Sequence, residues 1–307
     1  MKSAVLFIIF KREEITRKTF ARIREAQPPR LYIAADGPRS SHPEDVEKCM
    51  ATRKVVENVD WPCEVHRLYH DENLGCGHGP ASAITWFFEN EEKGVIIEDD
   101  ILPHIDFFKF CDEMLDRFED EERIHSVCGR NTTCKNLPTE KSYYLSSYSA
   151  IWGWATWRRV WQTYKFDLKE YSPVKVREKI NQRLPLRSAL YFNKIYDKMT
   201  TSNIDAWDYQ FFINMLICDR YSIMPYTNMI QNIGFGDPDA THTKNFSEKN
   251  LTVQAYSPYP LLNQGILTTD EWSDFQILKS SGQYVYPFLV RAYKKLHRDL
   301  ISFCKRF

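Results

Sequence analysis

The sequence predicts an α/β fold in which a mixed, mainly parallel sheet is flanked by helices and followed by a C-terminal helical extension. Two observations predict it. Strand-like and helix-like segments alternate through the first hundred residues, and the strand-like segments are short apolar runs that suit burial on both faces. With 307 residues the chain fits one main domain better than two equal halves. We place that domain at 1–245 and the extension at 246–307.

Each element is predicted from its apolar pattern and its turn residues. Continuous or alternating apolar runs predict strands at 4–10, 31–35, 63–69, 94–97, 124–128, 143–148 and 223–225. Helices are expected at 15–26, 44–59, 80–90, 106–118 and 208–218, with a further polar helical stretch at 174–199. Pro28 and Pro29 end the first helix, and Asp36-Gly37-Pro38 ends the second strand. An aromatic segment at 152–171 and a Gly-rich loop at 232–243 are left without a regular element.

Charge and composition exclude some classes of protein. Lys plus Arg and Asp plus Glu number 41 each, so no overall field marks a nucleic-acid binder. The apolar start is only as long as a strand and is followed at once by charged residues, and no apolar run is long enough to span a membrane. We therefore expect a cytoplasmic protein. The eight Cys form no CxxC pair and are expected to be mostly buried free thiols.

Three adjacent carboxylates follow a buried strand. The run 94–97 is apolar throughout and leads directly into Glu98-Asp99-Asp100. Neighbouring carboxylates repel one another unless a cation lies among them, and Mg²⁺ or Mn²⁺ prefers oxygen ligands of this kind. In open α/β sheets the ligand crevice lies at the carboxyl ends of the strands, where this cluster falls. A surface acidic turn is the simpler alternative.

These residues resemble the GT-A fold glycosyltransferases, which carry an acidic DxD-type motif after a hydrophobic strand. VIIEDD at 95–100, followed by Pro103 and a Phe-Phe helix, is similar to the N-acetylglucosaminyltransferase I group. A bacterial, family 2-like set of nucleotide-diphospho-sugar transferases is similar over about 1–245. The shared segments are LYIAADGPR at 31–39, NLG at 73–75, IWGWATW at 151–157, WDYQ at 207–210, and NIGFG at 232–236 leading to ATHT at 240–243.

The resemblance implies a role for each matching residue. Asp100 would bind a divalent metal, with His242 as a second metal ligand or a phosphate contact, while Asp99 and Glu98 would contact ribose or sugar hydroxyls of the donor. Asp36 would accept a hydrogen bond from the nucleobase, and Arg39, Asn73 and Gly75 would complete the donor site. Asp36 as a turn residue and His242 as a loop residue are the structural alternatives. The sequence departs from that pattern in two places. Relatives tend to read Asn-Arg-Pro where this chain has Lys11-Arg12-Glu13, and they often carry basic residues where it has Cys76-Gly77-His78. We expect His78 or Arg39 to supply the missing positive charge.

Asp208 is the candidate catalytic base. Transfer with inversion needs a base within reach of the acceptor hydroxyl, and Asp208 opens an apolar helix beside Trp207, where the resembling enzymes place theirs. Asp205 is the second candidate, and helix capping is the structural alternative for both. Trp152 and Trp154 are expected to share one face of an extended segment and to stack on a sugar, or else to pack beneath the site.

The C-terminal stretch 289–307 has apolar residues at alternating four- and three-residue steps with basic residues beside them. It predicts a basic amphipathic helix that either docks on the domain or contacts the inner face of the plasma membrane. The expected partners are therefore a nucleotide-sugar donor and a glycan or lipid-linked acceptor, with Mn²⁺ or Mg²⁺ as cofactor and no nucleic acid. The donor nucleotide, the sugar, the acceptor and the oligomeric state are left open.

Three other functions compete with glycosyl transfer. A zinc site is conceivable from the Cys and His residues at 63, 66, 70, 76 and 78, although their spacing is unlike that of usual zinc halves. A sugar nucleotidylyltransferase would need a Gly-rich basic loop after the first strand, and the segment 10–14 has no Gly. A non-catalytic protein that binds nucleotide sugars or carbohydrate with the same fold is the third alternative.

Overall fold

The structure is a computed structural model that describes residues 1–131, 141–201, 204–237, 254–262, 267–280, 282–283 and 285. Its centre is an eight-stranded sheet with the strand order β3-β2-β1-β4-β8-β6-β9-β7. These strands are β1 (Ala4–Ile9), β2 (Arg30–Ala35), β3 (Glu64–Tyr69), β4 (Lys93–Glu98), β6 (Ile124–Cys128), β7 (Tyr143–Ser146), β8 (Trp154–Trp157) and β9 (Tyr221–Pro225). The neighbours among β1 to β4 and the pair β6–β9 are parallel, whereas β8 and β7 run antiparallel to their neighbours. The predicted mixed, mainly parallel sheet is confirmed.

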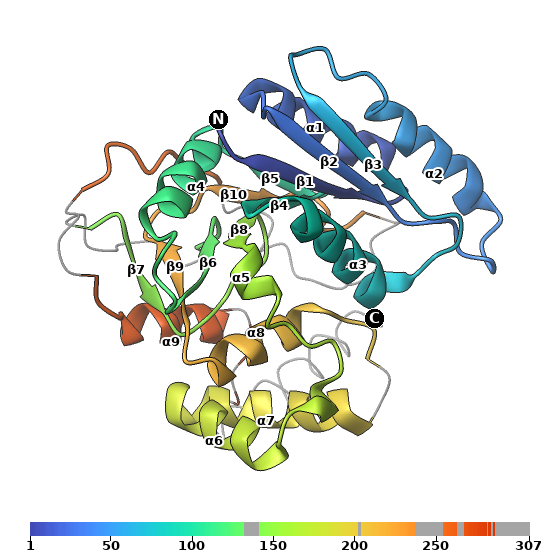
Figure 1. Ribbon diagram of the computed structural model, residues 1–307. Helices are drawn as coiled ribbons and strands as arrows, with labels where there is room; N and C mark the ends of the chain where they lie inside the picture. The colour runs from blue at the N-terminus through green and yellow to red at the C-terminus, as the bar shows by residue number, and fades with distance from the viewer. Residues whose placement is uncertain are drawn as a thin grey trace, which may run out of the picture.

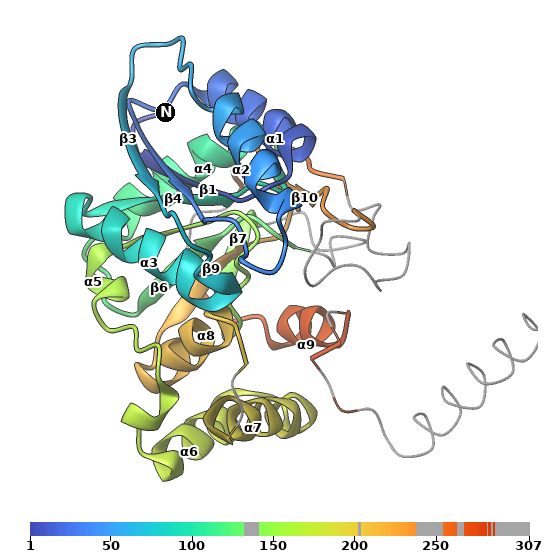
Figure 2. The ribbon, with the colours of Figure 1, turned by 90° about the vertical axis from the view of Figure 1, so that its right-hand side faces the viewer.

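Helices cover both faces of the sheet. In chain order the described helices are α1 (Glu13–Ala26), α2 (Glu44–Val55), α3 (Gly75–Asn90), α4 (Asp106–Arg117), α5 (Arg158–Trp161), α6 (Pro173–Arg183), α7 (Leu186–Thr201), α8 (Asp208–Ile217) and α9 (Glu271–Ser280). The pair α6–α7 lies beyond α8 (Figure 1). Figures 1 and 2 show α1 and α2 on one face of the β1–β3 half and α3 on the opposite face. A small second sheet pairs β5 (Ile101–Pro103) with β10 (Ile230–Asn232).

The alternation of side chains along the strands accounts for this layering. Phe7 and Tyr32 lie one register position apart on neighbouring parallel strands, so they point to opposite faces. Phe20 of α1 stacks on Phe7 with ring centroids 6.3 Å apart, and Phe87 of α3 meets Tyr32 edge-on at 5.0 Å. Both faces of these strands are therefore apolar, which is why they read as continuous hydrophobic runs.

A second hydrophobic cluster lies around α8. α8 contributes Phe211 to the main core, and Phe212 and Met215 to a cluster shared with the α6–α7 pair and α9. Figure 1 shows α6 and α7 on the far side of α8 from the sheet. The N-terminus of α8, where Asp208 lies, is thus held between two packed layers.

Besides the short elements β5, β10 and α5, which were not predicted, the structure differs from the predicted elements in four places. β8 lies inside the aromatic segment, the polar stretch 174–199 divides into α6 and α7 at Leu184 and Pro185, α3 begins at Gly75 rather than residue 80, and α9 lies within the expected extension. Pro185 has no N–H to continue a helix and restricts the residue before it, so the division follows from sequence. The other three depend on contacts with distant parts of the chain.

Part of the expected extension packs on the main domain. The Tyr256 N–H donates to the Asn228 carbonyl at 2.8 Å, and the Leu262 N–H donates to Ser142 Oγ at 2.6 Å. The domain boundary at 245, His242 and the basic stretch 289–307 lie outside the described residues. In the described part of the chain no helix has the length and apolarity to cross a membrane, and the six cysteines there are free thiols.

Asp274 anchors α9 to the sheet. Its carboxylate accepts from the Ser146 hydroxyl and from the Ser147 N–H at 2.8 Å. Burial raises the pKa of Asp274 to about 7, although both hydrogen bonds act to lower it. The folded protein therefore keeps a proton on this carboxyl that the unfolded chain releases near pH 4, as a carboxyl in water does at about 3.9.

We expect the free energy of unfolding to fall as the pH rises from about 4 to about 7, at up to about 1.4 kcal/mol per pH unit from this one group. The Asp274 contribution is fully present below the unfolded-state pKa and is lost as the pH rises through the folded-state pKa. Asp274→Asn should flatten the decline in urea unfolding, whereas Asp197→Asn on the exposed face of α7 should not. An unchanged slope in Asp274→Asn would show that Asp274 is ionised in the fold.

Candidate active site

Polar residues gather at one edge of the sheet, where the parallel strands end. Lys11 and Arg12 follow β1, Asp36 follows β2, and Glu98 ends β4 just before Asp99 and Asp100. Because these strands are parallel neighbours, their carboxyl ends share one edge. The sequence prediction of a site at this edge is consistent with where the structure places these residues.

Arg12 is the cation that the structure places among the carboxylates. Its guanidinium donates through Nε to Asp99 Oδ2 at 3.2 Å and through a terminal nitrogen to Asp99 Oδ1, and it lies 3.2 Å from Asp100 Oδ2. Asp99 and Asp100 are buried, and burial and the two charges act in opposite directions on Arg12, whose pKa is raised overall. We expected a divalent ion to relieve the repulsion, and the structure shows that Arg12 relieves part of it.

The loop after β10 closes over Asp100. The Ile233 N–H donates to the Asp100 carbonyl at 2.8 Å, and Asn232 Oδ1 accepts from the Gly234 N–H at 2.9 Å. A Cβ on Gly234 would lie 2.4 Å from Asp100 Oδ2, so only glycine lets the backbone pass this close. The predicted Gly-rich loop, which continues toward His242, therefore begins against the carboxylate cluster.

Glu98 and Asp208 lie close enough for their charges to interact. Ile96 is paired with Trp154 in the sheet, and Glu98, two residues further along β4, points to the same face as Ile96. That face is the one on which α8 packs, since Trp154 stacks on Trp207 with centroids 5.7 Å apart. Burial raises the pKa of Glu98 to about 8. The charges of Asp100 and Asp99, and to a smaller extent that of Asp208, act in the same direction, while Arg12 acts to lower it.

The residual charge and the donor atoms of this cluster fit a hard divalent cation. Glu98, Asp99 and Asp100 face a single guanidinium, and burial raises the pKa of Asp100 as well, although Arg12 lowers it. Carboxylate oxygens are the ligands that Mg²⁺ and Mn²⁺ take, usually one or two together with substrate phosphates and water. The described residues hold no ready-made group of three His, Cys, Asp or Glu ligands, which also leaves the zinc alternative without support there.

Asp36 organises the loop that leads into α3. Its carboxylate accepts from the Leu74 N–H at 2.9 Å, the Gly75 N–H at 3.2 Å and Asn73 Nδ2 at 2.9 Å, and from its own neighbour Gly37 at 2.9 Å. Burial raises the pKa of Asp36, and the three N–H donors oppose that shift. These contacts are those of the turn-forming alternative, and they bring Asn73 and Gly75 to Asp36.

Arg39 and His78 do not supply the free positive charge that we expected of them. Arg39 is bidentate on Asp45, which also accepts from Lys11 Nζ at 2.9 Å. Burial acts to raise the pKa of Asp45, but the hydrogen bonds from Arg39 and Lys11 outweigh it and lower the pKa. The exposed His78 ring stacks on Phe166 with centroids 4.0 Å apart.

Asp205 caps α3 rather than α8. Its two carboxylate oxygens accept from the N–H groups of Cys76 at 2.8 Å and Gly77 at 2.5 Å, the first turn of α3. Gly75 precedes them with φ +83°, and a Cβ there would lie 2.5 Å from Asp205 Oδ2. This contact joins the loop before α8 to the start of α3 and so fixes the approach to Asp208.

The two tryptophans of the predicted sugar platform have different environments. Trp154 is 1% exposed and covered by Trp207 and Phe211, so its ring faces are not available to a sugar. Gly153, with φ +62°, turns the chain between the two rings. Trp154 is therefore a core residue, which corrects the prediction, and only the half-buried Trp152 stays near the edge, against Phe235 of the Gly-rich loop at 5.5 Å.

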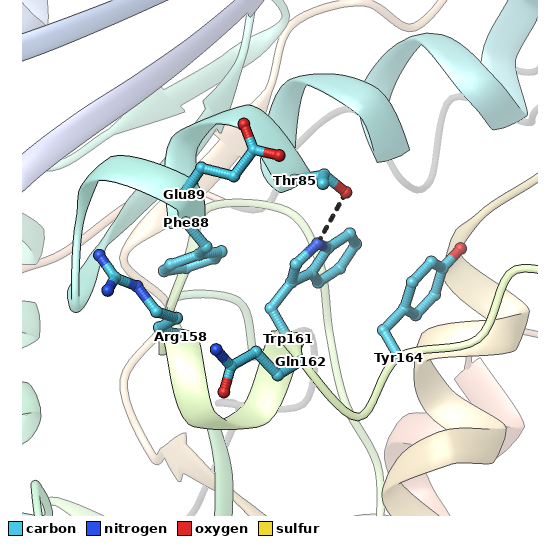
Figure 3. Close-up of a pocket in the computed structure, with 7 residues that line it drawn as sticks. All are labelled: Thr85, Phe88, Glu89, Arg158, Trp161, Gln162 and Tyr164. Atoms are coloured by element: carbon cyan, nitrogen blue, oxygen red, sulfur yellow. Dashed lines mark hydrogen bonds between the residues drawn. The ribbon is translucent and has the colours of Figure 1, made fainter.

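One open cavity of about 400 Å³ lies away from this edge (Figure 3). Residues of α3, of α5 and of the segment after it form its lining, and Trp161 Nε1 donates to Thr85 Oγ1 at 3.0 Å within it. Arg158, which lines the cavity, follows the last residue of β8, whereas the carboxylates lie beside the first. Its lining contains none of the site residues that the sequence predicts, so we take the carboxylate edge as the candidate active site.

No family model and no curated protein matches the sequence. Among similar solved structures are HddC from Yersinia pseudotuberculosis (TM-score 0.32, 10% identity, 53% of this chain and 80% of that one) and S. aureus TarS 1–349 (0.36, 10%, 55% and 51%). Apo UDP-glucose pyrophosphorylase is similar over 75% of this chain and 93% of its own, with TM-score 0.37 and 8% identity. At these TM-scores, neither fold nor activity is carried over from these proteins.

Asp205→Ala should lower the free energy of unfolding by about 1 kcal/mol, because two N–H groups of α3 lose their acceptor. Urea unfolding would measure it, with Asp167→Ala, which caps only a short 3-10 turn, as a comparison. A variant as stable as the parent would contradict the capping role.

Proposed function

We propose that this chain is a GT-A type glycosyltransferase that moves a sugar from a nucleoside-diphosphate donor to a glycan or lipid-linked acceptor, with inversion and with Mn²⁺ or Mg²⁺. One observation supports this above all: Asp99 and Asp100 pair with Arg12 at the carboxyl edge of a parallel sheet, and Glu98 beside them lies within electrostatic range of Arg12 and Asp208. A surface acidic turn would be exposed, whereas Asp99 and Asp100 are 4% and 9% exposed.

The order of the groups along the sheet edge suggests how a donor lies. Asp36 follows β2, Arg12 follows β1, the carboxylates follow β4, and Trp152 precedes β8. A nucleotide near Asp36 would place its diphosphate beside Asp100 and its sugar toward Trp152. In this arrangement Asp36 shapes the nucleotide loop through Asn73 and Gly75, while the Arg12–Asp99 pair fixes the position of Asp100.

Asp100 is the residue that we propose to hold the metal, with Glu98 nearby and His242 as a proposed further ligand. A bound divalent cation would neutralise charge on the departing nucleoside diphosphate, so that no protein acid is needed for that group. The chain's own part is to keep Asp100 in place. Arg12 contacts the carboxylate of Asp100, and the Ile233 N–H donates to its backbone carbonyl.

Asp208 is the proposed base. It occupies the first turn of α8, where the N–H groups of the helix stabilise an ionised carboxylate. Its charge acts on Glu98 and on the phenols of Tyr148, Tyr164 and Tyr209, so it lies within electrostatic range of Glu98, and this nearness supports the proposal. From there it would accept the proton of an acceptor hydroxyl on the side of the sugar away from the nucleotide.

A titration panel of nucleotide sugars, with and without Mn²⁺, followed by assays of donor hydrolysis and transfer, tests the proposal as a whole. Metal-dependent binding with transfer or hydrolysis is expected. Binding without any turnover would favour the non-catalytic alternative, and release of pyrophosphate from a nucleoside triphosphate and a sugar phosphate would favour nucleotidyl transfer. Absence of binding by every member of the panel would end the proposal.

Asp208→Asn should leave the Kd of the donor within about twofold and lower the rate of transfer by about 10²–10⁴-fold, because the amide keeps the shape but accepts no proton. Asp219→Asn, at the other end of the same helix and in a left-handed conformation that Asn tolerates, is the control. Undiminished transfer in Asp208→Asn would remove Asp208 from the mechanism.

Asp100→Ala should remove the stimulation of donor turnover by Mn²⁺ and slow turnover by about 100-fold, which corresponds to about 3 kcal/mol of lost charge stabilisation. Turnover measured across a Mn²⁺ titration would show it, with Asp116→Ala on the exposed side of α4 as the control. If Asp100→Ala keeps the native rate and metal dependence, then Asp100 does not hold a metal.

A further inference from the structure

Arg130 lies at the same edge, on the other side of Trp152 from the carboxylates. Trp154 of β8 is paired with Ile96 of β4 on one side and with Cys128 of β6 on the other. Because β4 and β6 run in the same direction, Glu98 and Arg130 lie two residues beyond those partners, at the same level. β8 lies between β4 and β6 in the sheet, so two strand spacings, about 10 Å, separate the ends of those two strands.

The guanidinium of Arg130 has an aromatic face, and no acidic side chain pairs with it among the residues that the structure describes. Its central carbon lies 3.6 Å from the centroid of the Trp152 ring, and its Nε is buried without a hydrogen-bond partner. Within the ranges that the structure describes, Arg130 makes no ion pair. Burial lowers the pKa of Arg130 to about 10, opposed only by the phenol of Tyr148, so no carboxylate compensates the charge there.

The other buried cations of this edge are paired, which makes Arg130 distinctive. Lys11 is held by Asp45, and Arg12 is held by Asp99 and Asp100. A half-buried cation without a counter-charge costs folding free energy that the stacking on Trp152 only partly offsets. A ligand anion is the partner that would complete it, since the N–H groups on the edges of a stacked guanidinium are directed to bind one.

We propose that Arg130 binds an anionic group, a carboxylate or a phosphate, on the sugar side of the site, carried either by the transferred sugar or by the acceptor. This inference rests on the proposed function and adds a substrate class to it. Trp152 supports the guanidinium from one face and is itself held by Phe235, which belongs to the loop that closes over Asp100. Trp152 would therefore orient Arg130, instead of presenting an open face to the sugar.

The position of Arg130 separates it from the diphosphate site. The nucleotide side of the edge is the β2–β1 side, where Asp36 and Arg12 lie, and Arg130 follows β6 beyond β8. The charge of Arg130 lowers the pKa of Tyr148, and the charge of Asp208 raises it. Tyr148 therefore lies within electrostatic range of both residues. Arg130 is thus on the same side of the carboxylates as the proposed base, where an acceptor enters.

The first test uses Arg130→Met, which keeps the length of the side chain and removes the charge. Titration with inorganic phosphate should show saturable binding to the parent protein, weakened at least about tenfold in Arg130→Met, as expected when charge-assisted hydrogen bonds are lost. Arg24→Met, on the exposed surface of α1, is the matched control and should bind phosphate like the parent. No binding by the parent, or equal binding by Arg130→Met, would overturn the proposal.

The stability of the unliganded variant separates binding from a structural role. If Arg130 serves a ligand, Arg130→Met should unfold at the same or a higher temperature, because an uncompensated charge has been removed. A clear fall in Tm would assign the residue to the fold instead. Binding of the nucleoside diphosphate alone should be unchanged in Arg130→Met, and an equal loss there would place Arg130 at the diphosphate and contradict the proposal.

Matched ligand pairs identify the source of the anion. UDP-glucuronate against UDP-glucose tests an anion on the transferred sugar, and glucose 6-phosphate against glucose, with UDP present, tests an anion on the acceptor. In one of the two pairs, the parent protein should bind the anionic member about tenfold more tightly than the neutral one, and Arg130→Met should not. That pair identifies the source of the anion. A preference for the anionic member that survives in Arg130→Met would count against the proposal. If no nucleotide sugar binds at all, the proposed function fails while the phosphate titration still decides the role of Arg130.

Discussion

The site depends on one ion pair, in which Arg12 at the end of the first strand faces Asp99 and Asp100 at the end of the fourth. Three carboxylates in sequence could not follow a buried strand without a compensating charge. Because Arg12 opens α1 and Thr19 of that helix donates to the Asp99 carbonyl at 2.7 Å, the acids are fixed to the core. The loop containing Gly234 then closes on the same pair.

The charge that Arg12 leaves uncompensated determines what the edge can do. A structural ion pair would balance its charges, whereas Glu98 and Asp100 here have raised pKa values, and Asp208 adds a further negative charge to the field at Glu98. An excess of buried negative charge is a common property of sites that take up a cation with an anionic substrate. Burying this excess negative charge lowers the stability of the fold, and binding of a cation would relieve the repulsion.

Local pattern was enough to predict seven of the eight strands of the main sheet, because most of them are apolar runs separated by clear turn residues, whereas β8 was missed. It also drew attention to Glu98, Asp99, Asp100 and Asp208 as candidates, since each of them follows or opens an apolar element. It failed where a partner is far along the chain. The role of Asp205 is set by amides of α3 about 130 residues earlier, and the position of Trp154 by rings of α8. Arg130 was missed, although its place just after an apolar strand was the signal that revealed the acids.

The distribution of paired and unpaired charge separates the edge into two functional halves. On the β1–β2 side, Lys11, Arg12 and Arg39 are all engaged by carboxylates, so an incoming anion there would meet cations that are already neutralised. On the β6 side Arg130 stacks on Trp152 and, within the described part of the chain, pairs with no carboxylate. If the proposed function holds, a nucleoside diphosphate on the first side would need charge brought by a metal, while an anion on the second side would find it in the protein. The proposed direction along the edge would then run from the nucleotide through Asp100 to Arg130, and both ends of a donor–acceptor pair would meet complementary charge.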